Sequence, residues 1–207
     1  MRKIALSILA FLVASPALAD MVADWNELLA SVDKAASPPE YMFNPATVQA
    51  GSKTLLAIYE AANAVDRRYA SYVGFPAAAR GASMDAAVAT AAHDAMLSFY
   101  PGEAKTIEDA YVLALANVPA GPGRDAGIAT GKAAAVAALA AGGLDPNLPQ
   151  AIYKPTAIAG KWAPSSLPYD PRDLQVRPWF MTSASQLRIG PPPALTSATY
   201  AASVNET

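Results

Sequence analysis

The stretch from Ser83 to Pro101 constrains the fold of this 207-residue chain more than any other. Ser83 is typical of a helix N-cap, and Asp85 follows in the first turn, where a carboxylate suits the positive end of the helix dipole. Pro101-Gly102 ends the pattern. Apolar residues recur at helical spacing, namely Val88, Ala92, Ala95, Met96, Phe99 and Tyr100. Polar residues form a narrow stripe on the other side, namely Thr90, His93, Asp94 and Ser98.

The same stretch is rich in alanine, which lets neighbouring helices approach closely. Because most of its surface is apolar or small, we expect most of that surface to be covered. The sequence therefore predicts a central helix with the other helices packed around it. This helix also carries His93, the only histidine in the chain.

The first 19 residues have the pattern of a secretory signal peptide. Arg2 and Lys3 precede an apolar run over residues 4–14 that is too short to span a bilayer, and Ala17-Leu-Ala19 is a typical cleavage site. The alternative is an uncleaved N-terminal membrane anchor. With the signal removed, we expect no membrane association and a periplasmic or secreted protein.

Composition narrows the function classes. The chain has no cysteine, so neither disulfides nor thiolate metal sites are available to it. Its 15 lysines and arginines are balanced by 17 acidic residues, so nothing suggests binding to nucleic acid. With 53% hydrophobic residues, a core of ordinary size is expected in one domain.

Four other stretches before residue 145 have helical patterns. They start at Asp24, Asn44, Glu103 and Arg124 and run to about residues 37, 68, 118 and 141. Asp24 with Glu27 resembles a capping box, so we expect the first of these helices to begin at Asp24. The second ends in Arg67 and Arg68, and its periodic apolar residues are Val48, Leu55, Leu56, Ile58, Tyr59, Ala62 and Val65. The stripe expected for the third is Ile107, Tyr111, Ala114 and Val118.

Small residues recur every four positions in the last of these stretches, at Gly127, Gly131 and Ala135. In a membrane this spacing would favour dimerising spans, but nearby charged residues such as Asp125 and Lys132 favour a soluble buried helix. Residues 20–145 are thus predicted to form an all-α bundle of about five helices.

Beyond residue 145 the pattern changes. Ten of the 18 prolines lie between Pro146 and Pro193, and about fifty residues without periodicity are unusual in a compact domain. The segment has too many aromatic residues for a disordered linker. We therefore predict a proline-rich irregular belt over residues 146–195, anchored by Trp162, Tyr169, Trp179 and Phe180. A further helix is expected over residues 196–207, and since it shows no C-terminal signal we interpret it as the start of a truncated helix.

Several motifs in order carry a resemblance to a known family. They are Ala57-Ile-Tyr-Glu-Ala-Ala-Asn-Ala-Val-Asp66, Ala91-Ala-His-Asp94, Tyr100-Pro-Gly102, Gly121-Pro122, Asp125-Ala-Gly-Ile128, Gly160-Lys-Trp-Ala-Pro164, Pro191-Pro-Pro-Ala-Leu-Thr-Ser197, Tyr200 and Asn205-Glu206. Together they resemble the N-terminal half of bacterial vanadium-dependent haloperoxidase-like proteins of the type 2 phosphatidic acid phosphatase superfamily. The resemblance covers nearly all of the chain after the signal and implies a helical bundle.

The resemblance also implies where the chemistry of such a protein lies. Vanadate or a phosphoryl group is held by a lysine, two arginines and a serine, while one histidine binds the metal or attacks phosphorus and a second moves protons. The three motifs that supply these groups are absent here. Arg177-Pro178 has no suitably placed lysine before it, and only one histidine is present. We therefore expect the vanadate site, and the partner of this chain, in a missing C-terminal half of the same fold.

Consequently, no catalytic, cofactor-binding or metal-binding residue is predicted within this chain. His93 and Asp94 could form an acid/base pair, but adjacent helix positions diverge, so a helix-surface or capping role is favoured for His93. Three acidic residues could bind a metal but are interpreted as a solvated helix start, namely Glu103, Glu108 and Asp109. Gly121-Pro-Gly123 lacks the lysine of a phosphate-binding loop.

Two functions are compatible with these sequence features. The first is the non-catalytic N-terminal portion of an exported vanadium haloperoxidase-like or acid phosphatase-like protein. The alternative is a complete small exported helical module that binds a partner or ligand. A homo-oligomer is compatible with either.

Overall fold

In a computed structural model of the protein, the described residues are 21–36, 45–143, 156, 158, 159, 161 and 176–206. They form six α-helices, namely α1 (Met21–Ala36), α2 (Pro45–Val65), α3 (Met84–Phe99), α4 (Ala104–Ala116), α5 (Pro122–Ala140) and α6 (Ala198–Asn205). A 3-10 turn, η2 (Pro101–Glu103), joins α3 to α4. No β-strand occurs among these residues, which confirms the all-α prediction. Nor is any helix among them long and apolar enough to cross a membrane.

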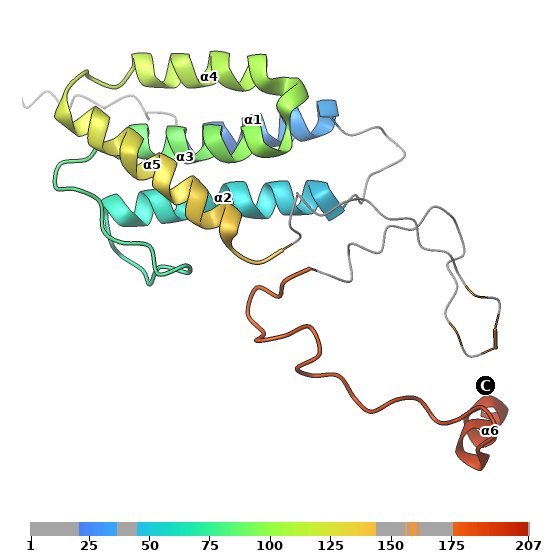
Figure 1. Cartoon of the computed structure of the whole chain (residues 1–207). Coiled ribbons are helices and arrows are strands. Elements are labelled where there is room, and N and C mark those ends of the chain that lie inside the picture. The colour runs from blue at the N-terminus through green and yellow to red at the C-terminus, as the bar shows by residue number, and fades with distance from the viewer. Residues whose placement is uncertain are drawn as a thin grey trace, which may run out of the picture.

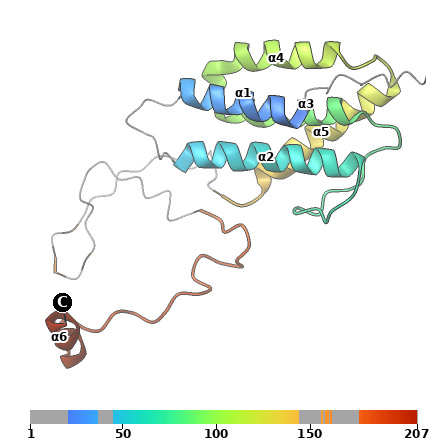
Figure 2. The same ribbon diagram turned by 180° about the vertical axis from the view of Figure 1, so that it is seen from behind.

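Helix α3 is the centre of the bundle, as predicted. It packs against α1, α2, α4 and α5, and α5 crosses on one side of it while α1 lies on the other (Figures 1 and 2). The Ser83 side chain caps the helix by accepting a hydrogen bond from the Ala86 N–H at 3.3 Å. Ten of its residues are buried, and six of them are alanines, so burial here comes from close backbone approach more than from large side chains.

The closest approach is between α3 and α5, and glycine makes it possible. A Cβ atom added at Gly131 would lie 2.4 Å from the Ala87 carbonyl oxygen, and one at Gly127 would lie 2.5 Å from the Ser83 carbonyl oxygen. Both neighbours are backbone atoms that no side-chain rotation can move. The small-residue spacing therefore marks a helix–helix contact, in agreement with the prediction of a buried helix.

Two details of α1 and α2 differ from the sequence prediction. Helix α1 begins at Met21 and not at Asp24, which instead lies in the first turn, where its carboxylate also suits the helix dipole. On α2 the expected apolar residues Val48 and Leu55 are exposed, whereas the charged residues Lys53 and Glu60 are buried. Helix α2 is covered by the alanine-rich surfaces of α3 and α5, so its small residues face the bundle.

The loop after α2, residues 66–83, is attached to that helix by polar side chains. Asn63 Oδ1 accepts hydrogen bonds from the N–H groups of Arg68 and Tyr69, and its Nδ2 donates to the Tyr69 carbonyl at 2.9 Å. Glu60 Oε1 accepts from the N–H groups of Tyr72 at 2.6 Å and Val73 at 3.1 Å. Arg67, predicted within the last turn, lies beyond α2 and donates to a loop carbonyl. The loop is thus held in one conformation by α2.

The proline-rich belt is attached to the bundle through Arg177, Trp179 and Phe180. Gly143 and Arg177 form an antiparallel bridge, with N–H···O distances of 2.7 and 3.0 Å. The Arg177 guanidinium donates to the carbonyls of Ala140 and Ala141, which satisfies free acceptors at the C-terminal end of α5. The Tyr72 hydroxyl donates to the Trp179 carbonyl, and its ring stands edge-on to Phe180 at 5.3 Å between ring centroids.

These contacts confirm part of the predicted anchor. Trp179 is half-buried against the loop, but Phe180 remains 88% exposed despite its contact with Tyr72. The other two predicted anchors, Trp162 and Tyr169, lie outside the described residues. Irregular backbone is confirmed for residues 176–197, which contain only an isolated bridge, turns and bends.

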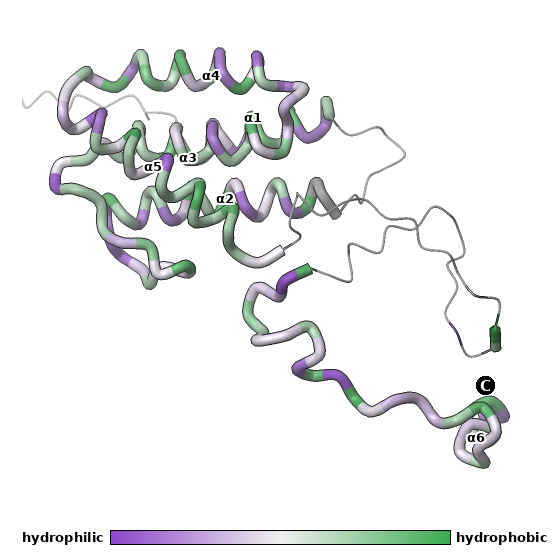
Figure 3. The backbone as a smooth tube through the Cα atoms, in the orientation of Figure 1, coloured by the Kyte–Doolittle hydropathy of each residue, from purple (hydrophilic) through white to green (hydrophobic). Residues whose placement is uncertain are grey.

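Residues 181–206 form a C-terminal arm that leads away from the bundle (Figures 1 and 2). It ends in α6, whose predicted start is confirmed, since the Ser197 hydroxyl accepts from the Tyr200 N–H at 3.1 Å. Apolar residues occur at several places along the arm, although the arm lies apart from the core (Figure 3). Its exposed large apolar residues are Met181, Leu187, Ile189, Leu195, Tyr200 and Val204.

Candidate functional site

The polar groups that the fold brings together lie between α3 and α4. These helices form a hairpin about the turn at Tyr100 and Pro101, so residues equally far from the turn face each other. His93 is seven residues before Tyr100, and Glu108 is seven residues after Pro101. Thr90 and Tyr111 are related in the same way, at ten residues.

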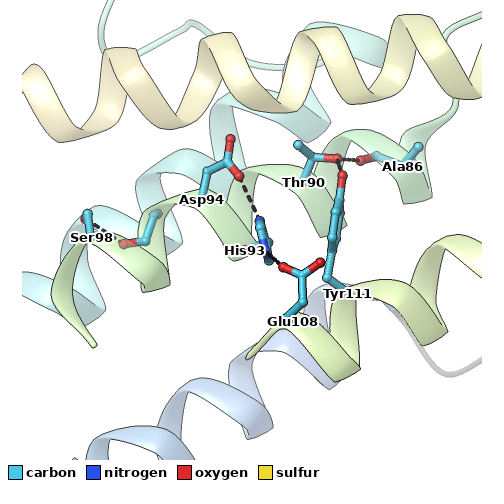
Figure 4. A network of polar contacts seen from close by, with 8 residues as sticks. Ala86, Thr90, His93, Asp94, Ser98, Glu108 and Tyr111 are labelled. Atoms are coloured by element: carbon cyan, nitrogen blue, oxygen red, sulfur yellow. Dashed lines mark hydrogen bonds and ion pairs between the residues drawn. The ribbon is translucent and has the colours of Figure 1, made fainter. Parts of the chain in front are cut away.

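His93 is the centre of this group, which we call the His93 cluster: Thr90, His93, Asp94, Glu108 and Tyr111. Its ring lies between two carboxylates (Figure 4), with Nδ1 2.7 Å from Asp94 Oδ1 and Nε2 2.8 Å from Glu108 Oε2. Both ring nitrogens therefore face acceptors. Only a doubly protonated imidazolium can donate to both at once.

The charge on His93 follows from this geometry. The side chain is buried, and burial by itself lowers the pKa of His93 because it penalises the charged form. The hydrogen bonds and negative charges of Asp94 and Glu108 outweigh burial, so the pKa of His93 is raised above its ordinary value. The cluster is thus an ion pair between helices that is strongest when His93 carries its proton.

Tyr111 completes the cluster from the α4 side. Its ring stacks on the His93 imidazole, with 4.1 Å between ring centroids and 21° between planes. Its hydroxyl lies 3.0 Å from the Thr90 hydroxyl, which also donates to the Ala86 carbonyl at 2.7 Å. The stack and the hydrogen bond fix the ring orientation of His93 relative to α4.

The structure corrects three predictions about these residues. His93 is buried beneath α4 together with Thr90 of the same polar stripe, so it is neither a surface nor a capping residue. His93 and Asp94 do face each other, because the short Asp94 side chain turns back toward Nδ1 although the Cα–Cβ directions diverge. Glu108, interpreted as solvated, keeps a half-exposed side chain but bonds to His93.

The other candidate positions have structural partners. Asp109 pairs with Lys105 on the surface of α4 at 2.6 Å, and Glu103 is 3.5 Å from the Thr106 hydroxyl. Within the part of the chain that the structure describes, no three His, Cys, Asp or Glu side chains are grouped closely enough to hold a metal ion. The Trp179 and Phe180 rings contact Tyr72, and together with Ser52 and Leu56 they also line a shallow cavity of about 300 Å³.

The cluster can be tested against the chemistry of an oxyanion site. Vanadate or a phosphoryl group requires cationic donors around the oxyanion and a histidine nitrogen that is free to bind or attack. Here the histidine is flanked by two carboxylates, which repel an oxyanion, and both of its nitrogens are engaged. Arg177, the only arginine in an Arg-Pro pair, donates instead to backbone carbonyls at the C-terminal end of α5. These residues do not fit vanadate.

Sequence reasoning missed the roles of Glu108 and Tyr111, although a signal for both was present. Once residues 83–101 and 103–118 are taken as helices joined by Pro101-Gly102, their hairpin register places Glu108 opposite His93 and Tyr111 opposite Thr90. Assigning that register requires the length of the turn between the two helices, and Pro101-Gly102 marks this turn in the sequence. Comparison with known proteins adds no further constraint, because no family model, curated protein or solved structure matches this chain.

Proposed function

We propose that this chain is the non-catalytic N-terminal helical portion of an exported vanadium haloperoxidase-like or acid phosphatase-like protein. In this proposal the oxyanion site belongs to a C-terminal portion of the same fold. The order and spacing of the motifs along the sequence support this proposal. In the structure, Tyr59, Glu60 and Asn63 of the first motif hold the loop after α2.

One observation carries the non-catalytic part of the proposal. The chemistry of that family needs two histidines, one of them with a nitrogen free to bind the metal or attack phosphorus. This chain has one histidine, and Asp94 and Glu108 engage both of its nitrogens. His93 therefore serves the packing of α4 on α3.

The C-terminal arm supports the expectation that this chain packs against a C-terminal portion of the same fold. Leu187 and Ile189 are exposed to 78% and 87%, and no helix of the described bundle covers them. Helix α6 has eight residues, and helices this short are marginal in water unless they pack against something. An apolar arm of this kind is suited to packing against a further portion of the protein.

The alternative, a small exported helical module that binds a partner or ligand, also has an observation in its favour. Residues of α1 and α4 line a groove of about 300 Å³, with Trp25 and Leu28 on one side and Leu113 and Ala114 on the other. Most of its lining is apolar. Its size would admit a small apolar group, but its shape does not specify one.

The first test is activity. We expect the purified chain, after signal removal, neither to brominate a phenol dye with vanadate, bromide and peroxide nor to hydrolyse an aryl phosphate above the buffer background. Each missing cationic donor or positioned histidine costs orders of magnitude, typically about 10²-fold or more. Turnover that depends on vanadate and disappears in His93→Ala would contradict the proposal and assign His93 a catalytic role.

A second prediction concerns the arm. The chain should bind an environment-sensitive hydrophobic dye, and Leu187→Ser/Ile189→Ser should reduce the signal by about half or more, since exposed apolar patches are the sites that such dyes bind. Val136→Ser on α5 is the control, because Val136 is also a largely exposed apolar residue, at 69%, but lies on the bundle. Equal dye binding by both variants would show that the arm is not the apolar surface in question.

Translation of the DNA that follows the codon of Thr207, in all three frames, separates the two functions. A lysine followed by Arg-Pro, then Pro-Ser-Gly-His, then Ser-Arg with a nearby histidine would support the proposal. If all three motifs are absent from that locus, the alternative is favoured.

A further inference from the structure

Helix α4 has fewer fully buried residues than any other helix of the bundle. Ile107 is its only fully buried residue, while Val112 and Leu113 are exposed. It packs chiefly against α3, and the groove lined by Trp25 and Leu113 separates it from α1. A helix with a single fully buried residue is expected to open locally at a lower free energy than the rest of the bundle.

The His93 cluster supplies the polar part of the α3–α4 contact. The Nε2–Glu108 hydrogen bond crosses between the helices, whereas the Nδ1–Asp94 bond stays within α3. A neutral imidazole has one N–H, so it can donate to only one of the two carboxylates. The other contact then places a nitrogen lone pair against a carboxylate oxygen, which is repulsive.

The exposure of the two carboxylates decides which contact is lost. The Asp94 side chain is 32% exposed and the Glu108 side chain is 56% exposed, so Glu108 can turn to water at lower cost. The neutral ring therefore keeps its proton on Nδ1, toward Asp94, and Nε2 loses Glu108. Losing the proton on His93 therefore removes the Nε2–Glu108 bond between the helices and leaves the Thr90–Tyr111 hydroxyl contact in place.

From these contacts we propose that His93 is a pH-dependent latch for α4: protonated, it holds α4 on α3, and deprotonated, it lets α4 open and uncover Trp25, which lines the groove. The groups that face His93 are Asp94 on α3 and Glu108 and Tyr111 on α4. No charged group on the described parts of α1, α2 or α5 acts on it. Since it is the only histidine, no other side chain of ordinary pKa changes charge near neutrality.

The direction of the pH effect follows from the raised pKa. A histidine whose pKa is higher in the folded than in the unfolded state stabilises the fold fully below the unfolded pKa, about 6.5. That contribution is lost as the pH rises through the pKa of the folded state. Helix α4 should therefore be held at pH values below about 6.5 and open more often as the pH rises past the raised pKa of His93.

The test is amide hydrogen exchange of the whole folded chain, compared as protection factors at about pH 6 and about pH 8. Amides of α4 from Tyr111 to Leu115 should lose protection by about three- to fivefold at the higher pH, as expected for a partly exposed ion pair. Amides of α2 should not change. Equal protection of α4 at both pH values would overturn the proposal.

Two matched variants locate the effect. Glu108→Gln should abolish the pH dependence, because an amide can accept from the charged ring and donate to the neutral one. Asp109→Asn makes the same kind of change one residue away, but its partner Lys105 is on the same helix, so the pH dependence should remain. If Glu108→Gln keeps the wild-type pH response, His93 does not act through Glu108.

An optical readout checks the opening itself. In a Trp162→Phe/Trp179→Phe background, Trp25 is the only tryptophan, and it is 2% exposed in the closed bundle. Acrylamide quenching of its fluorescence should rise by about twofold between pH 6 and pH 8 and should not rise in His93→Gln. Quenching that is independent of pH in the single-tryptophan background that keeps His93 would show that α4 does not open over Trp25.

Discussion

Replacing Gly131 by leucine should lower the free energy of unfolding by about 3 kcal/mol or more. The Cβ atom alone would lie 2.4 Å from the Ala87 carbonyl oxygen and 2.7 Å from Thr90 Cβ. Since the first neighbour is backbone, α5 must move away from α3 to relieve the contact, and the alanines around it lose their packing. Urea or thermal unfolding of the purified chain measures the loss.

A second glycine provides the control for this prediction. Gly51 also lies within a helix, α2, but a Cβ atom there would meet nothing within 4 Å. Gly51→Ala should therefore stabilise the protein by about 0.5–1 kcal/mol through helix propensity. Gly131→Ala has the same propensity gain but should destabilise, because even one methyl group does not fit. An unchanged melting temperature for Gly131→Leu would mean that α5 does not pack on α3 as described.

Asn63→Ala should cost about 2–3 kcal/mol and loosen the loop after α2. Asn63 is buried, and the substitution removes three hydrogen bonds to the backbone of Arg68 and Tyr69 while leaving those groups without their partners. The measurement is chemical denaturation together with limited proteolysis between residues 66 and 83.

Two further variants test whether hydrogen bonding is the cause. Asn63→Asp keeps the oxygen that accepts from Arg68 and Tyr69 but loses the donor to the Tyr69 carbonyl, so its loss should be smaller than that of the alanine variant. Asn26→Ala on the exposed side of α1 should change stability by no more than about 0.5 kcal/mol. A similar loss for Asn63→Ala and Asn26→Ala would exclude the proposed role of the loop contacts.

Much of the helical organisation could be predicted from local signals. Ser83 and Pro101-Gly102 bound α3 correctly, and Ser197 marks the start of α6, because capping residues and prolines act on the backbone next to them. The Gly127–Gly131 spacing indicated a close helix contact for the same kind of reason, since four residues return to the same face of a helix. At α1 the local signal was misleading, because an acidic residue suits the first turn as well as the N-cap, and the helix begins at Met21, before Asp24.

The candidate site was less predictable. The interpretation of His93 as a helix-surface residue assumed that polar side chains mark exposed positions, but α4 covers that face of α3 and brings its own carboxylate to the ring. The assumption that polar side chains are exposed also fails on α2, for Lys53 and Glu60. Lys53 is buried with its Nζ donating to the Leu139 carbonyl at 2.6 Å, and Glu60 accepts from the loop backbone. Their partners are distant in sequence, so no local pattern reveals them.

By itself the sequence determined where most helices begin and end, that one glycine-lined face must meet another helix, and that a single histidine limits the chemistry. These properties depend on residues that are close together in the chain or on the number of residues of one type. The tertiary structure alone decided that His93 lies between Asp94 and Glu108, that Arg177 caps α5, and that Lys53 and Glu60 are buried. The physical reason is that burial and hydrogen bonding depend on which elements pack together, and alanine-rich helices offer many alternative faces of nearly equal hydrophobicity.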